Sequence, residues 1–79
     1  MTEFSENLPN IGDGVVEGEI VEWLVKVGDY VQTEDPIVSV MTDKATVEIS
    51  YQSKKSTYVS KLHGEVGDIV AVNEPIITL

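Results

Sequence analysis

One lysine near the middle of the chain is the residue best placed to do chemistry. Lys44 lies in the short segment Thr42-Asp43-Lys44, between an apolar run that ends at Met41 and another that begins at Ala45. Two strands joined by so few residues form a tight hairpin, so the amine is displayed at the tip of a protrusion. An amine open on all sides is poorly suited to be a nucleophile itself and well suited to be acylated by another enzyme. An ordinary solvated turn lysine is the competing interpretation.

Other reactive side chains are too few or too scattered to form a site. The chain has no cysteine, which excludes a disulfide framework and a thiolate metal site. Its one histidine, His63, precedes Gly64 and is interpreted as a solvated residue at a strand end. We therefore predict no catalytic residue and no metal ligand. The chain has 79 residues, which form one thin core without room for an enclosed active site.

The charge balance excludes two classes of partner. The sequence has fourteen acidic residues, five lysines and no arginine, which give a net charge of −9. Phosphate recognition needs a basic patch, so we expect neither nucleic acid nor an anionic membrane as partner. Residues 1–53 hold eleven acids and two lysines, whereas residues 54–79 are neutral overall. No apolar run is long enough to span a membrane, and no export signal is visible.

Composition and alternation predict an all-β domain. Thirteen valines and seven isoleucines outnumber four leucines and two alanines, and β-branched residues suit a pleated surface. No segment carries helix-capping signals. In the first strand, alternation places Val21, Trp23, Val25 and Val27 on one buried face. The expected strands are Ile20–Val27, Ile37–Met41, Ala45–Ser50, Tyr58–Leu62, Ile69–Val72 and Ile76–Leu79, after a loop over Leu8–Val15.

An internal repeat predicts how these strands are arranged. Val27–Val40 aligns without gaps on Val66–Leu79, 39 residues later, and six of the fourteen positions are identical. Each copy reads as strand, Gly-Asp turn, short strand, proline, strand. Two copies of a unit too small to bury its own apolar face predict a quasi-symmetric sandwich or flattened barrel.

The chain resembles the lipoyl domain of dihydrolipoyl acyltransferases, the core components of 2-oxo-acid dehydrogenase complexes. The resemblance covers nearly the whole chain and is carried by three segments: LPNIGDGV (8–15), GEIVEWLVKVGD (18–29) and MTDKATVEI (41–49). It implies one lipoyl domain over residues 1–79. The implied fold is a flattened β-barrel, a barrel-sandwich hybrid, of two four-stranded antiparallel sheets with quasi-two-fold symmetry.

The resemblance also implies a cofactor and the residues that serve it. Lys44 would carry covalently attached lipoate, with Thr42, Asp43 and Ala45 beside it as recognition elements. The loop Leu8–Val15 would lie near the lipoyl-lysine and contribute to recognition by the decarboxylase. Its implied recognition residues are Ile11, Gly12, Asp13 and Gly14.

The resemblance further implies a carrier function without catalysis by the domain alone. The decarboxylase component would reductively acylate the lipoyl group, and the acyl group would pass to coenzyme A at the acyltransferase core of the same parent chain. Dihydrolipoyl dehydrogenase would reoxidise the dithiol, and a lipoylating enzyme would attach the cofactor. The segment MTDKATVEI (41–49) looks most like bacterial branched-chain acyltransferases, with pyruvate-type enzymes next. The implied location is the cytoplasm of a bacterium, or the mitochondrial matrix of a eukaryote.

One departure and two alternatives stay open. The family usually has a proline and a glycine after the post-lysine strand, whereas Ser50–Thr57 has neither, so the conformation of that turn is not predicted. A biotinyl carrier domain of a carboxylase shares the fold but normally has methionine on both sides of its lysine. An unmodified β-barrel that serves as a binding module is the second alternative.

Overall fold

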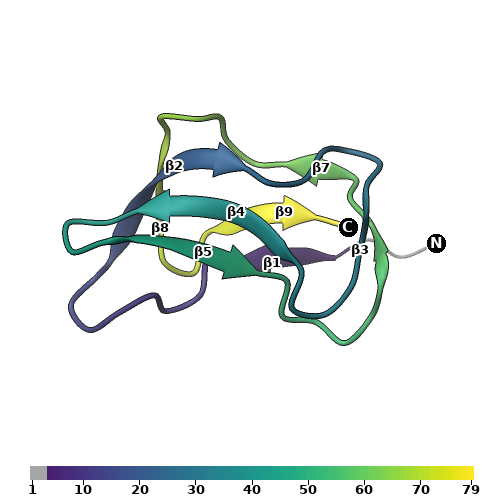
Figure 1. The fold of residues 1–79 in the computed structure, drawn as a ribbon, viewed down its shortest axis with the longest axis horizontal. Coiled ribbons are helices and arrows are strands. Elements are labelled where there is room, and N and C mark those ends of the chain that lie inside the picture. The colour runs from purple at the N-terminus through teal and green to yellow at the C-terminus, as the bar shows by residue number, and fades with distance from the viewer. Residues whose placement is uncertain (1–3) are drawn as a thin grey trace.

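Short β-strands joined by turns and loops make up the part of the chain that the structure describes. A computed structural model describes residues 4–79 and contains no helix in that range, so no helix there could cross a membrane. This confirms the predicted all-β class. The strands (Figure 1) are β1 Ser5–Asn7, β2 Glu17–Trp23, β3 Tyr30–Val31, β4 Pro36–Met41, β5 Thr46–Ser50, β6 Thr57–Tyr58, β7 Lys61–Leu62, β8 Ile69–Ala71 and β9 Pro75–Thr78.

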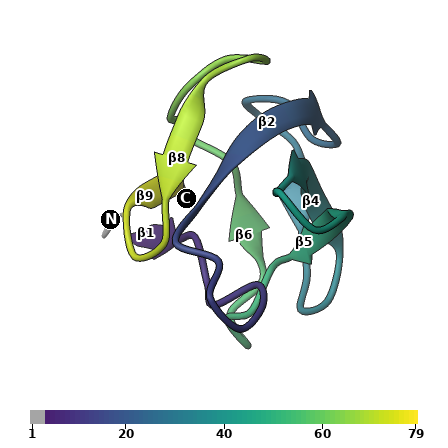
Figure 2. The ribbon, with the colours of Figure 1, turned by 90° about the vertical axis from the view of Figure 1, so that its left-hand side faces the viewer.

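The strands wrap around one apolar interior. One layer is a four-stranded antiparallel sheet in the order β5-β4-β2-β8, and the other is built from β1-β9-β7 and the pair β3-β6. Figure 2 looks onto one end and shows the strands arranged around a common centre. The side chains that fill this centre are Leu8, Ile20, Val25, Val31, Ile37, Val38, Val40, Ile49, Tyr51, Val59, Ile76, Ile77 and Leu79.

Backbone hydrogen bonds repeat at the spacing of the sequence repeat. The amide of Gly28 donates to the Val59 carbonyl at 2.8 Å. Thirty-nine residues further along, the amide of Gly67 donates to the Ile20 carbonyl, also at 2.8 Å. The two halves therefore close on each other in the same way, which confirms the quasi-two-fold arrangement.

The repeated Gly-Asp pairs are turns that need both residues. In the first copy, the Asp29 carboxylate accepts a hydrogen bond from the Lys26 amide at 2.8 Å. In the second copy, the Asp68 carboxylate does the same for Glu65 at 2.9 Å. The glycine before each aspartate has a φ of +97° or +99°, a region that glycine adopts without steric cost.

Three strands differ from the sequence prediction. The first expected strand, Ile20–Val27, begins and ends earlier in the structure, as β2 over Glu17–Trp23. β1 was not predicted, because its three polar residues carry no apolar alternation. The expected strand Tyr58–Leu62 is divided into β6 and β7. The division has a physical reason, since the chain changes partner at Val59: β6 pairs with β3, whereas β7 pairs with β9.

The predicted buried face of the first strand was wrong in part. A register shift between Ile20 and Glu22 marks a β-bulge in β2, and a bulge shifts the in–out alternation by one residue. Ile20 is therefore buried, whereas Val21 is exposed. Val25 does reach the core, but Val27 is 62% exposed in the turn that follows.

Candidate functional site

The predicted hairpin between β4 and β5 forms one end of the molecule, and we call it the finger. Met41 pairs with Thr46, and the Thr42 amide donates to the Ala45 carbonyl at 2.8 Å. Only Asp43 and Lys44 project beyond this last bond. The finger lies at the end of the long axis opposite the C-terminus (Figure 1).

The side chain of Thr42 fixes the shape of the tip. Its hydroxyl oxygen accepts hydrogen bonds from the Lys44 and Ala45 amides, both at 3.1 Å. The same hydroxyl donates to the Ala45 carbonyl at 2.9 Å. Neither residue at the tip needs a positive φ, so lysine is accommodated there without backbone strain. The threonine thus supplies locally the bonds that hold the tip closed.

The Lys44 side chain is exposed and makes one hydrogen bond to a distant loop. Its Nζ donates to the Asp13 carbonyl at 2.6 Å, across 31 residues of sequence. A Cβ at Gly14 would lie 3.4 Å from the same Nζ, so the loop backbone runs directly beside the amine. The predicted proximity of the loop Leu8–Val15 to the lysine is therefore present in the unmodified protein.

The loop is held in place by its own bonds and by anchors in the core. The Asn10 side chain accepts from the Gly12 amide at 3.0 Å, and the Val15 amide donates to the Gly12 carbonyl at 3.2 Å. Leu8 is fully buried, and Ile11 is half-buried against the core. This arrangement leaves the backbone around Asp13 exposed beside the finger.

All the predicted recognition residues gather at this end of the molecule. Asp43 and Ala45 are exposed on the finger, and Thr42 is half-buried beneath them. On the loop, Ile11 serves as an anchor rather than as surface, because it is half-buried against the core. The remaining three are exposed, namely Gly12, Asp13 and Gly14.

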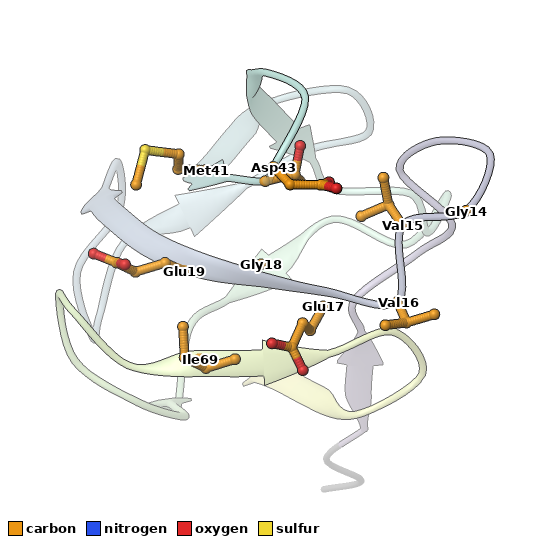
Figure 3. A pocket seen from close by; sticks show the side chains of 10 residues that line it. Gly14, Val15, Val16, Glu17, Gly18, Glu19, Met41, Asp43 and Ile69 are labelled. Atoms are coloured by element: carbon orange, nitrogen blue, oxygen red, sulfur yellow. The ribbon is translucent and has the colours of Figure 1, made fainter.

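An open groove beside the finger was not predicted from the sequence. The finger groove has a volume of about 570 Å³ and is lined by residues 14–19, 41–43 and 69. Figure 3 shows the side chains of Val16, Met41 and Ile69 around β2, with Glu17, Glu19 and Asp43 among them. The pairing of β8 with β2 places Ile69 next to Glu19, 50 residues away in sequence. No local sequence pattern predicts this contact.

The side chains at this end, within the described residues, do not form a metal-binding cluster. Within residues 4–79, no group of three histidine, cysteine, aspartate or glutamate side chains is placed to hold a metal ion. What this end displays is an exposed lysine on a finger, beside a barrel filled by its own side chains.

Comparisons with known proteins place the chain in a family. The family model described as "Biotin-requiring enzyme", which covers biotin and lipoyl attachment domains, matches residues 6–79. The chain therefore belongs to the biotin/lipoyl attachment family.

Named relatives narrow the class within that family. A lipoamide acyltransferase component of the branched-chain alpha-keto acid dehydrogenase complex from Pseudomonas putida is 44% identical over 72 residues, which are 91% of this chain and 16% of the relative. The acetyltransferase component of the pyruvate dehydrogenase complex from Staphylococcus aureus is 40% identical over 76 residues, 96% of this chain and 17% of that protein. The chain thus spans about a sixth of these relatives and is a lipoyl domain, the class that carries lipoate covalently on a lysine.

Proposed function

We propose that the chain is the lipoyl carrier domain of a 2-oxo-acid dehydrogenase acyltransferase, and that Lys44 is its attachment site. The observation that carries this proposal is the exposed amine of Lys44 at the tip of the finger. The bonds of Thr42 hold that tip in one shape, which a lipoylating enzyme can recognise through Asp43 and Ala45.

The residues around Lys44 fit an amide-linked group. The amine belongs to an exposed side chain, and it donates its hydrogen bond to a backbone group, the Asp13 carbonyl. After attachment, the amide nitrogen of the modified lysine keeps one hydrogen, so it can still donate a hydrogen bond to the Asp13 carbonyl. When attached, lipoate supplies a disulfide ring that accepts an acyl group and two electrons, a chemistry that this cysteine-free chain lacks.

Attachment also changes the charge of the domain. Acylation removes the positive charge of a lysine, so the net charge of −9 would become one unit more negative. The domain would present this acidic surface to its partners. By tethering, a carrier raises the effective concentration of its group at each partner's active site.

Lipoylation in cells tests the attachment site. We expect the intact mass of the domain, co-expressed with a lipoylating enzyme, to increase by one lipoyl group. Lys44→Arg should abolish the increase, because a guanidinium does not deprotonate to form the amide. Lys54→Arg, at an exposed lysine in the turn after β5, is the matched control and should be fully modified.

The same experiment decides between cofactors. Co-expression with a biotin ligase should leave the mass unchanged. A biotin adduct on Lys44 without a lipoyl adduct would reject this proposal in favour of a carboxylase carrier domain. If neither group is added, the chain is an unmodified binding module.

We also propose which type of complex the domain belongs to and which proteins are its partners. We favour a branched-chain complex, supported by the finger sequence and by the 44% identity to the Pseudomonas protein, with the pyruvate complex as the second candidate. The partners would be the decarboxylase, the acyltransferase core and dihydrolipoyl dehydrogenase, in the bacterial cytoplasm or the mitochondrial matrix. Acylation assays with pyruvate and with a branched-chain 2-oxo acid distinguish the two complexes.

A further inference from the structure

We propose that the finger groove is a resting site for the lipoyl arm of Lys44. This inference rests on the proposed attachment of lipoate to that lysine. It goes further, because it assigns a binding site for the arm on the surface of the domain itself rather than treating the arm as free in solvent.

Three large apolar side chains that line the groove are exposed to solvent. Val16 is 69% exposed, Ile69 is 58% exposed and Met41 is 44% exposed. These are three of the eight large hydrophobic side chains exposed on the described residues, and all three line one groove. Clustered exposed apolar groups mark binding surfaces, so the groove is suited to an apolar occupant.

The root of the arm lies at the rim of this groove. Lys44 Nζ is held against the Asp13 carbonyl at 2.6 Å, beside Gly14, which itself lines the groove. A Cβ at Gly14 would lie 3.4 Å from this nitrogen, so the glycine leaves the space beside the amine open. Met41 and Asp43, on the same hairpin as the lysine, form the opposite wall (Figure 3).

The quasi-symmetry of the barrel supports an occupant at this end alone. The positions equivalent to Glu19 and Ile69, 39 residues away, are Tyr58 and Tyr30. Those two rings stack edge to face at 5.0 Å between centroids, so the far end covers its own strand surface with aromatic side chains. At the finger end the same positions leave a groove open, and that end carries the lysine.

The charges of the groove define what the occupant must be. Glu17, Glu19 and Asp43 line it, with no basic side chain among the lining residues. These carboxylates disfavour an anionic ligand, such as a free fatty acid. An arm joined to Lys44 by an amide is neutral and largely apolar, so it can contact the apolar side chains and is not repelled by the carboxylates.

Methyl spectra of the lipoylated domain test this inference. We expect attachment to shift the methyl resonances of Val16, Met41 and Ile69, with nuclear Overhauser contacts between them and the protons of the dithiolane ring. The double substitution Val16→Thr and Ile69→Thr keeps β-branched side chains while making the groove polar, and it should remove the ring contacts. Val27→Thr is the matched control, since Val27 is 62% exposed in a turn outside the groove.

The intact mass separates failure of this inference from failure of the proposed function. A fully lipoylated domain whose shifts are confined to the finger and the loop would overturn the groove assignment and leave the carrier function intact. Ring contacts that persist in the polar double variant would also overturn it. A domain that is never lipoylated on Lys44 would reject both proposals together.

Discussion

At the scale of single residues, the finger depends on one hydroxyl. A two-residue hairpin usually relies on positive φ angles at its tip, which favour asparagine and glycine. Here the tip is Asp43-Lys44 with ordinary φ angles, and Thr42 supplies three hydrogen bonds instead. The position of the lysine therefore depends on a residue that does not itself react.

We expect Thr42→Val to loosen the tip without unfolding the barrel. The substitution leaves the Lys44 and Ala45 amides without their shared acceptor, and a hydrogen bond contributes about 0.5–1.5 kcal/mol. Amide hydrogen exchange at these two residues should then accelerate about two- to tenfold. Thr42→Ser keeps the hydroxyl and is the matched control; equal acceleration in the serine variant would contradict this role.

At the scale of elements, the contact between β2 and β4 depends on a missing side chain. Gly18 is buried in β2, and a Cβ there would overlap the Val40 side chain of β4. The equivalent position in the second half is Thr57, so the glycine is required by packing in the first half only. This close approach sets the base of the finger, because β4 continues directly into it.

Gly18→Ala should destabilise the domain. Overpacking a tight core costs about 1–3 kcal/mol, and 1 kcal/mol lowers the melting temperature of a domain of this size by about 4–8 °C. Thermal denaturation measures the loss. In the double variant Gly18→Ala and Val40→Ala, the new methyl group gains room, so the two losses should be less than additive. Strict additivity would show that the overlap with Val40 is not the cause.

The turn that could not be predicted, Ser50–Thr57, closes without proline or glycine. Tyr51 is fully buried, and its hydroxyl donates to the Lys55 carbonyl at 2.6 Å. On the other side, the Thr33 hydroxyl donates to the Ser53 carbonyl, also at 2.6 Å. Hydrogen bonds from these two side chains thus satisfy backbone carbonyl groups of the turn. They hold the segment in place without the proline and glycine that usually shape such a turn.

At the scale of the whole molecule, shape and charge together suit an encounter led by the finger. The domain measures 37 × 22 × 18 Å, with the finger at one end of the long axis (Figure 1). Glu17, Glu19 and Asp43 lie in the groove beside that end, and residues 1–53, which include Lys44, carry the whole net charge. A basic surface on a partner would attract this end first.

Reductive acylation of the lipoylated domain should therefore slow as salt is added. At an ionic strength of 0.15 M, charges are screened beyond about 8 Å, which weakens electrostatic steering. The rate is measured with the decarboxylase at low and high salt. Free lipoamide, which lacks the acidic domain, is the control and should show little dependence. A rate for the domain that is unchanged by salt would exclude steering by its charge.

Local features of the sequence determined the class of the fold and the position of the lysine. The excess of valine and isoleucine, the 39-residue repeat and the short Thr42–Lys44 segment predicted a quasi-symmetric β-barrel with a finger. These predictions succeed because strand alternation and turn chemistry depend on neighbouring residues.

Tertiary structure alone decided which surfaces meet around the lysine. The bulge in β2 exposed Val21, β8 placed Ile69 in the finger groove, and the loop carbonyl of Asp13 reached Lys44. Each of these depends on the register between segments distant in sequence. A shift of one residue in register reverses which side chains face the core, and the sequence pattern of a single strand does not fix that register.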